Sequence, residues 1–221
     1  MEIKMSNTFI LNQEANVAST YINELRDVNV QKDRARFRRN LERIGELLSY
    51  ELSKTLEYEN VDIKTPLGTS PSRRVKDQLV VTTILRAGLP MYEGVLNVFD
   101  HADSGFVASY RSSTGTDEVE INMEYVASGN LDGKVVILAD PMLATGKSLL
   151  LALEGLLKNG TPKHVHILAA ISSQQGVDYV KENINVPASL WIGAVDPEMN
   201  EKSYIIPGLG DAGDLCFGEK L

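Results

Sequence analysis

At the centre of the chain stands the stretch Val135-Val-Ile-Leu-Ala-Asp-Pro-Met-Leu-Ala-Thr-Gly-Lys-Ser148. Its first five residues are aliphatic and predict a short buried strand. Proline cannot donate to a sheet ladder, so Asp140-Pro141 ends that strand. The apolar run that begins at Leu149 then predicts a helix. Free backbone N–H groups and the helix dipole at such a helix start favour a bound anion, most often a phosphate.

The chain has 221 residues, enough for one full-sized core, and we expect a single domain over 1–221. Its one cysteine, Cys216, excludes an internal disulfide and a cysteine zinc site, and it fits a reducing cytoplasm. No apolar run is long enough to span a bilayer, and the first residues do not resemble a signal peptide. A formal net charge of −8 argues against general nucleic-acid binding and leaves room for a small anionic ligand held by a local cationic cluster.

The N-terminal segment, residues 1–67, is expected to be mainly helical. A short helix is predicted around residues 16–26. A second, longer helix is predicted over 32–57, because apolar residues recur there at spacings of three and four and form one stripe. Val61 to Thr65 alternates like a strand that Pro66 stops, and the polar residues 68–77 are interpreted as a surface loop.

Strands alternate with helices from residue 79 onwards. The expected strands are 79–85, 104–110, 135–139, 164–170 and 188–194, and the expected helices are 91–98, 149–157 and 175–183. This alternation indicates an α/β fold with a mainly parallel sheet flanked by helices.

Two segments depart from this alternation. Residues 117–126 alternate strictly between apolar and polar side chains, which predicts either one half-exposed strand or a β-hairpin flap, and the segment 112–133 is assigned to the flap. The stretch from Tyr204 to Gly218 carries four glycines from Gly208 on, and we expect it to be neither an ordinary helix nor a strand. Such exposed backbone suits close approach to a planar ligand.

Charged residues stand at the ends of four predicted strands, namely Arg86, Arg111, Asp140 and Asp196. Ligands of open α/β sheets bind outside the carboxyl ends of the strands. We therefore expect these four side chains to face one crevice.

Three phosphate-binding patterns compete for the loop after Ala139. A Walker A loop requires glycine five positions before Gly146, where this chain has Pro141. A dinucleotide fingerprint requires three glycines, and residues 140–148 contain one. The third pattern, a strand-end acid followed by Thr-Gly-x-Ser at a helix start, resembles the phosphoribosyl-diphosphate loop of the phosphoribosyltransferases.

Other motifs extend this resemblance over nearly the whole chain. They are Ile84-Leu-Arg-Ala-Gly-Leu89, Asp140-Pro-Met-Leu-Ala-Thr-Gly146, Tyr204-Ile-Ile-Pro-Gly-Leu-Gly-Asp-Ala-Gly-Asp214, Phe37-Arg38 with Leu48-Ser-Tyr-Glu51, and Tyr110-Arg111. Together they resemble the uracil phosphoribosyltransferases, and the C-terminal motif is the most specific of them. The resemblance implies a phosphoribosyltransferase-like fold in which residues 196–221 form a glycine-rich, uracil-binding hood. It also implies transfer of a phosphoribosyl group from 5-phosphoribosyl 1-diphosphate to uracil, giving UMP and diphosphate in pyrimidine salvage.

The resemblance also implies a role for each matching residue. Arg86 would bind the diphosphate and Asp140 the ribose hydroxyls, which makes both of them, with Asp211, candidate catalytic residues. The residues expected to bind the phosphoribosyl donor are Arg86, Arg111, Asp140, Pro141, Met142, Leu143, Ala144, Thr145, Gly146, Lys147, Ser148 and Asp211. Those expected to bind uracil, largely through the backbone, are Ile205, Gly210, Asp211 and Ala212.

Cofactor and partners follow from the same resemblance. Mg²⁺ would arrive with the donor, so no metal cage built from protein side chains is expected. A homodimer or higher homo-oligomer is typical of the family, and GTP activates some of its members. Neither a nucleic-acid partner nor a membrane partner is expected.

Three positions differ from the family pattern. Lys147 stands where the family usually has glycine, Leu215 replaces an arginine, and Ser112-Ser113 replace acidic residues. Lys147 either reinforces phosphate binding or projects into solvent, and the sequence leaves both interpretations open.

Two other functions compete with uracil transfer. One is a phosphoribosyltransferase-like protein that acts on another base or has reduced activity. The other is a nucleotide-sensing regulator that binds RNA, which would require a basic face. The net charge of −8 and the short basic cluster at residues 73–76 argue against the regulator.

Overall fold

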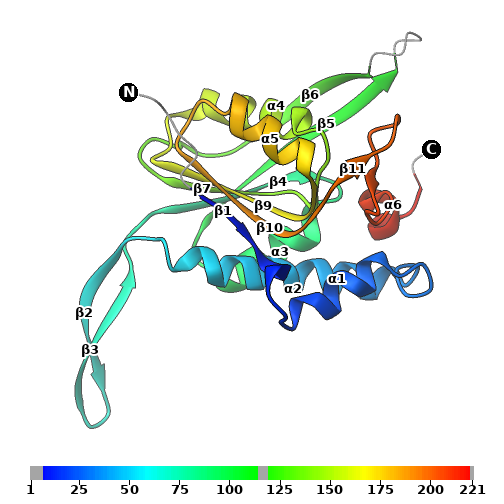
Figure 1. Ribbon diagram of the computed structural model, residues 1–221. Helices are drawn as coiled ribbons and strands as arrows, with labels where there is room; N and C mark the ends of the chain where they lie inside the picture. The colour runs from blue at the N-terminus through cyan, green and yellow to red at the C-terminus, as the bar shows by residue number, and fades with distance from the viewer. Residues whose placement is uncertain (1–6, 114–118, 220–221) are drawn as a thin grey trace.

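A mixed sheet forms the centre of the molecule (Figure 1). The computed structural model describes residues 7–113 and 119–219, with the side chains of 109–124 outside the description. In these residues the main path of the sheet runs β1 (Asn7–Ile10), β10 (Ala188–Asp196), β9 (His164–Ser173), β7 (Val135–Ala139), β4 (Leu79–Leu85), β5 (Asp103–Ser113) and β6 (Val119–Ala127). The short β8 (Met142–Leu143) also pairs with β9. Neighbouring strands are parallel except β5 and β6, which confirms the predicted fold class.

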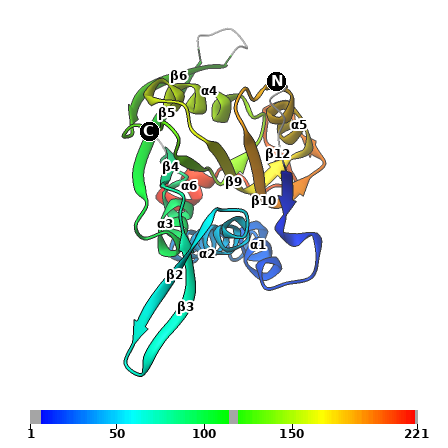
Figure 2. The same cartoon turned by 90° about the vertical axis from the view of Figure 1, so that its left-hand side faces the viewer.

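Helices cover both faces of this sheet (Figure 2). On one face lie α1 (Ala18–Arg26), α2 (Arg34–Ser53) and α3 (Leu89–Val98), which share one apolar cluster. On the other face lie α4 (Lys147–Leu156) and α5 (Gln174–Asn183), which share a second cluster. Short 3₁₀ turns, η1 (Leu11–Gln13) and η2 (Leu157–Asn159), follow β1 and α4. The sheet therefore separates two apolar cores.

The long helix α2 confirms the predicted apolar stripe. Its stripe residues are at most 1 % exposed, namely Phe37, Leu41, Ile44, Leu48 and Leu52. Asp33 caps the helix by accepting a hydrogen bond from the Arg36 amide. Burial of each large apolar side chain contributes roughly 1.5–3 kcal/mol.

The N-terminal segment contains two strands that the sequence did not indicate, at residues 7–10 and 68–75, beside the strand predicted at 61–65. β1 adds an edge strand next to β10. β2 (Tyr58–Thr65) and β3 (Gly68–Val75) form an antiparallel hairpin that projects from the body of the molecule (Figure 1). The interpretation of residues 68–77 as a loop is therefore wrong. Both faces of this hairpin are mostly exposed, so backbone pairing holds it together, and no alternation of apolar residues marks β3.

The C-terminal stretch also differs from expectation. It contains β12 (Ile205–Ile206), which pairs with β11 (Glu198–Met199), and the short helix α6 (Ala212–Phe217). The expectation of neither helix nor strand is wrong here. The Asp211 side chain accepts a hydrogen bond from the Asp214 amide and so starts the helix despite the surrounding glycines.

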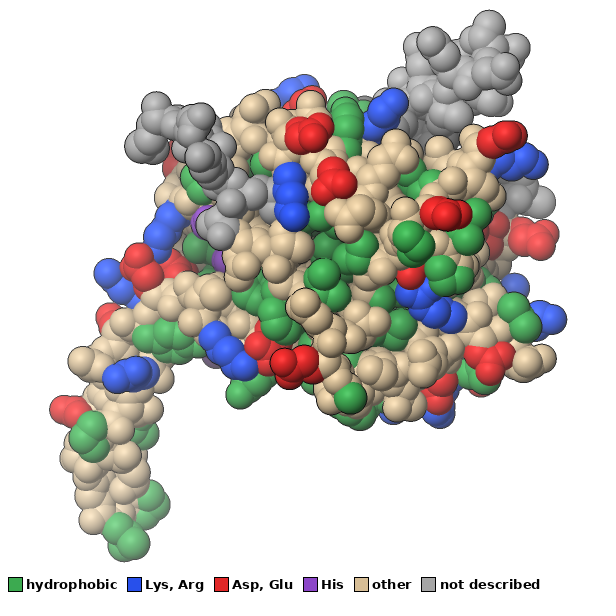
Figure 3. All heavy atoms as spheres, viewed as in Figure 1, with side chains coloured by type: hydrophobic (Ala, Val, Ile, Leu, Met, Phe, Trp, Pro, Cys, Tyr) green, Lys and Arg blue, Asp and Glu red, His purple; other side chains and the backbone are tan. Residues whose placement is uncertain are grey.

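The surface mixes charges of both signs. Acidic and basic side chains are interspersed over the described part of the face seen in Figure 3. Among residues 7–113 and 119–219, no helix combines the length and the apolar character needed to cross a membrane.

Two histidines, His164 and His166, lie close together at the amino-terminal end of β9. Their rings are 4.6 Å apart, and Trp191 donates a hydrogen bond of 3.0 Å from its indole nitrogen to His166 Nδ1. His166 is 4 % exposed, and burial lowers its pKa to about 3, with His164 adding to the decrease and Asp77 opposing it. Burial also lowers the pKa of His164.

This histidine pair predicts loss of stability in mild acid. The folded pKa of His166 lies below the unfolded value of about 6.5, so its contribution is complete above pH 6.5 and is lost as pH falls towards 3. Between these limits the free energy of unfolding should fall by about 1.4 kcal/mol per pH unit for His166 alone. We expect the free energy of unfolding, measured by urea titration, to fall less steeply between pH 7 and 5 in His166→Gln than in the unsubstituted protein. His101→Gln is the control, because the His101 side chain is 98 % exposed. If the free energy of unfolding fell equally with pH in all three proteins, His166 would not be the source of the acid sensitivity.

A second prediction concerns Gly88, which joins β4 to α3. A Cβ at this position would lie 2.0 Å from Thr83 Oγ1 and 2.8 Å from the Ile84 carbonyl oxygen. Gly88→Ala should therefore lower the free energy of unfolding by about 1–3 kcal/mol, measured by urea titration. Gly129→Ala, where a Cβ meets nothing within 4 Å, should change it by less than about 0.5 kcal/mol. Equal effects would show that the close packing at Gly88 is not what the substitution disturbs.

Candidate active site

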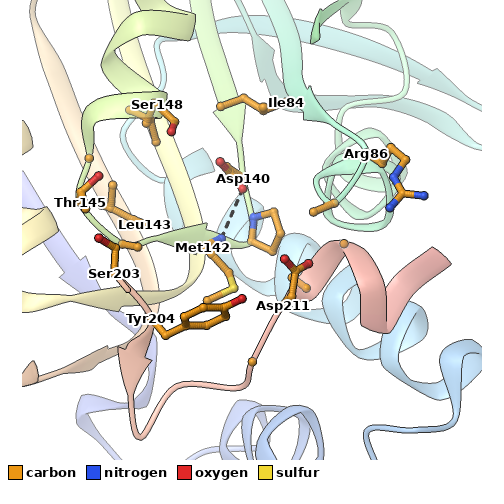
Figure 4. Close-up of a pocket in the computed structure, with 18 of the residues that line it drawn as sticks. Ile84, Arg86, Asp140, Met142, Leu143, Thr145, Ser148, Ser203, Tyr204 and Asp211 are labelled. Atoms are coloured by element: carbon orange, nitrogen blue, oxygen red, sulfur yellow. Dashed lines mark hydrogen bonds between the residues drawn. The ribbon is translucent and has the colours of Figure 1, made fainter. Parts of the chain in front are cut away.

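A cavity of about 320 Å³ opens at the carboxyl ends of β4 and β7. Three segments line it: the turn after β4, the loop from β7 to α4, and the C-terminal residues 202–204 and 210–213. Figure 4 shows side chains of all three segments around one space. The position matches the rule that parallel α/β sheets bind ligands outside their carboxyl strand ends.

The loop between β7 and α4 supplies the acid and the helix start. Asp140 follows the last residue of β7, and its Oδ1 accepts a hydrogen bond from the Met142 amide at 3.3 Å (Figure 4). Gly146 begins α4 with a φ of +77°, and no side chain caps this helix. A non-glycine residue would be strained at that φ. The Lys147 amide donates to Thr145 Oγ1 at 3.4 Å, which leaves the next N–H groups of the first turn available to a ligand.

Two buried serines hold the same loop from β9. Ser172 Oγ donates to the Leu143 carbonyl at 3.1 Å, and Ser173 Oγ donates to the Ala144 carbonyl at 2.6 Å. Ser173 Oγ also accepts from the Gly176 amide at 2.8 Å, which caps α5. The loop is therefore preorganised by groups outside the cavity.

The predicted phosphate-loop residues are mostly on the cavity wall. The structure places Asp140, Pro141, Met142, Leu143, Ala144, Thr145, Gly146 and Ser148 there. Lys147 is exposed and is not one of the lining residues. This position favours the solvent-pointing interpretation of Lys147 in the state described by the structure.

Arg86 stands on the opposite side of the cavity from Ser148 and Thr145 (Figure 4). Its guanidinium donates to the Gly218 carbonyl at 3.3 Å and lies 3.7 Å from Asp214 Oδ1. The guanidinium therefore lines the cavity and also contacts α6 and the residue that follows it. Arg111, the other predicted cation, lies within β5 and not at its end, and its side chain is outside the described part of the structure.

The C-terminal segment closes the third side. Of the four residues predicted to bind uracil, Gly210, Asp211 and Ala212 line the cavity, whereas Ile205 is buried and does not line it. Lining residues that were not predicted as site residues are Ile84, Leu85, Ala87, Leu149, Lys202, Ser203, Tyr204 and Gly213. Tyr204 is the first residue of the C-terminal motif, so its position in that motif could have identified it as a site residue.

Asp196 is not part of the cavity, and the expectation that it faces the common crevice is wrong. It is 5 % exposed, and its two oxygens accept from Arg26 at 2.8 Å each. The strand β10 that carries it lies at the far side of β9 from β7, so its end is displaced from the crevice.

The charges of the cavity suit a phosphorylated sugar. The positive end of the α4 dipole and the Arg86 guanidinium are separated by the carboxylates of Asp140 and Asp211 (Figure 4). Anionic groups can bind at the two positive positions, and hydroxyl groups can donate to the acids between them. Within the described residues, no three acidic, histidine or cysteine side chains gather to hold a metal.

Comparison with known proteins identifies the family. The family model for uracil phosphoribosyltransferase matches residues 13–219. A uracil phosphoribosyltransferase from Porphyromonas gingivalis is 47% identical over 211 residues, covering 96% of this chain and 98% of that protein. One from Pyrococcus furiosus is 39% identical over 203 residues, covering 90% and 85%. A solved structure of a protein from Aquifex aeolicus superposes with a TM-score of 0.84 at 32% identity, over 96% of this chain and 98% of that one. The chain therefore belongs to the uracil phosphoribosyltransferase family.

Proposed function

We propose that this protein transfers the phosphoribosyl group of 5-phosphoribosyl 1-diphosphate to N1 of uracil, giving UMP and diphosphate. The observation that carries the proposal is the single cavity shared by an open helix start, a strand-end acid, Arg86 and a glycine-rich C-terminal segment. Membership of the uracil phosphoribosyltransferase family over residues 13–219 supports it. The enzyme is a glycosyltransferase of pyrimidine salvage.

The donor would lie across the cavity. Its 5-phosphate would accept hydrogen bonds from the first turn of α4 and from the hydroxyls of Thr145 and Ser148, which line the wall. Its ribose hydroxyls would donate to Asp140, and its diphosphate would face Arg86, with Arg111 as a second cation. An arginine fork suits a phosphate because it donates two parallel hydrogen bonds.

The base would lie against the C-terminal segment. The backbone of residues 210–212 offers donors and acceptors that suit the O2, N3–H and O4 edge of uracil, with Ile205 behind it. Asp211 lines the cavity, which supports a role towards the donor as well. Base and sugar are thereby held in line for attack.

Bond changes in the transfer define what the site must stabilise. The bond between ribose C1 and the diphosphate oxygen breaks, and its electron pair leaves with diphosphate. The N1 lone pair forms the new bond to C1, and the N1 proton passes to water or to the departing diphosphate. Positive charge develops on the ring carbon and negative charge on the leaving group, so Arg86 would stabilise the latter.

Magnesium is proposed to accompany the donor. Asp140 and Asp211 are hard oxygen ligands of the kind that Mg²⁺ accepts, and two carboxylates suit an ion that keeps water and substrate oxygens as its other ligands. Asp211 would hold it, directly or through water. The ion would supply neutralisation of the diphosphate charge.

Further features of the family extend the proposal. We propose that the protein forms a homodimer or a higher homo-oligomer in the cytoplasm and that GTP is an activator. Light scattering would report the assembly, and UMP formation with and without GTP would report the activation.

The test of the function incubates purified protein with labelled uracil, 5-phosphoribosyl 1-diphosphate and Mg²⁺. We expect labelled UMP, and no product from adenine or guanine. Failure to form any nucleotide from the three bases would sink the proposal, and product from a purine alone would reassign the base.

Asp140→Asn and Arg86→Ala test the two ends of the donor site. Each should lower kcat/KM for the donor by at least about 100-fold, because each removes a charge that binds or stabilises the donor. Circular dichroism and thermal unfolding should match the unsubstituted protein. Rates near the original in either folded variant would show that the site is misplaced.

Lys147→Gly tests the exposed lysine at the start of α4. Because Lys147 does not line the cavity, the KM for the donor should change by less than about threefold. A rise of about tenfold or more would show that its ammonium reaches the bound phosphate.

A further inference from the structure

Two charged residues outside the cavity hold its C-terminal wall. We infer that Arg26 and Asp196 are positioning residues for the base-binding segment 205–213, an inference that rests on the proposed function. Neither residue lines the cavity. Their effect on the base would pass entirely through the backbone of this segment.

Asp196 and Arg26 form a fork-shaped ion pair. Arg26 Nη1 donates to Asp196 Oδ2 and Nη2 donates to Oδ1, both at 2.8 Å. The arginine lies in the last turn of α1, where the helix dipole also favours a cation. The Asp196 side chain is 7% exposed and that of Arg26 is 21% exposed, so the pair is largely shielded from water. Bidentate pairs of this kind fix orientation as well as charge.

Both members of the ion pair form hydrogen bonds with the backbone of Gly208. The Gly208 amide donates to Asp196 Oδ2 at 2.9 Å, and its carbonyl accepts from Arg26 Nη1 at 3.2 Å. Gly208 has a φ of +57°, and a Cβ there would lie 2.1 Å from the Ile205 carbonyl oxygen. Gly208 has no side chain of its own, so the sharp turn is held through its backbone N–H and carbonyl groups, which bond to Asp196 and Arg26.

The next residue, Leu209, is also held by a side chain of the N-terminal segment. The Leu209 carbonyl accepts from Gln31 Nε2 at 3.1 Å, and that amide also donates to the Leu25 carbonyl at 2.8 Å. The Leu209 side chain is 4 % exposed. The two residues that follow, Gly210 and Asp211, line the cavity.

This chain of contacts links α1 to the base site. A change in the Arg26 fork would release Gly208, and the displacement would reach Gly210 and Asp211 two and three residues later. The donor loop 140–148 is held separately by Ser172 and Ser173. Loss of the fork should therefore weaken uracil binding more than donor binding.

The test measures both KM values and kcat for Arg26→Gln, Arg26→Lys and the neutral pair Arg26→Gln with Asp196→Asn. For Arg26→Gln we expect the KM for uracil to rise roughly 10- to 100-fold, because small misplacement of a binding group is costly. The KM for the donor should rise by a smaller factor, because Asp211 is the one proposed donor-binding residue in the displaced segment. Arg26→Lys keeps the charge without the fork and should recover part of the loss. Simple loss of folded enzyme would lower kcat and leave both KM values unchanged.

Arg36→Gln is the matched control. Arg36 forms a comparable fork with Glu24 of α1, at 2.8 and 2.6 Å, but it does not contact the segment 205–213. We expect its KM for uracil to remain within about twofold of the unsubstituted value.

Hydrogen exchange gives a readout that does not depend on activity. Backbone amides of 205–213 should exchange faster in Arg26→Gln than in the unsubstituted protein, and Arg36→Gln should leave them unchanged. If Arg26→Gln does not fold, the neutral pair replaces it, because it buries no unpaired charge. Unchanged exchange together with an unchanged KM for uracil in a folded Arg26 variant would overturn the inference. Absence of UMP from the unsubstituted protein would overturn the proposed function instead, and the exchange data would still decide the role of Arg26.

Discussion

The parallel pairing of β4 with β7 is the constraint on which the site depends. Thr83 lies opposite Ala139, and its Oγ1 donates to the Ala139 carbonyl at 2.8 Å. This register brings the ends of the two strands side by side, so Arg86 and Asp140 leave the sheet at the same edge. Gly88 lets the turn after β4 pass within contact distance of Thr83. A shift of one residue in either strand would send the side chains of that strand to the opposite face.

Support from neighbouring elements turns this edge into a preorganised cavity. Serines of β9 hold the loop that starts α4, and the Arg26–Asp196 pair holds the turn at Gly208. In both places a buried polar group is satisfied by backbone atoms of the site and does not itself line the cavity. The cost of leaving such groups unpaired is what keeps the loops in place without a ligand.

Arg86 is both a cation of the cavity wall and a contact of the C-terminal helix α6. The guanidinium lies 3.7 Å from the carboxylate of Asp214 in the first turn of α6 and donates to the carbonyl of Gly218 just after the helix, so α6 is held against the Arg86 side of the cavity. Leu215 replaces the arginine typical of the family beside Asp214, and Arg86 stands near that acid. The donor would compete with α6 for the same cation.

Local sequence patterns determined most of the elements of this protein. The strands at 79–85 and 135–139, the stripe of α2 and the helix start after Gly146 follow from periodicity and from proline and glycine chemistry, which act within a few residues. Motif resemblance indicated Arg86, Asp140 and the segment 210–212, which line one cavity. Only the tertiary structure decided the partner of Asp196, the hairpin of β2 and β3, and the membership of Lys202 and Ser203 in the cavity wall. For Asp196 and the cavity wall the physical reason is that the partner is distant in sequence, and neither side-chain period nor residue spacing encodes that contact. The hairpin joins neighbouring segments, but β3 is exposed on both faces and therefore carries no apolar period.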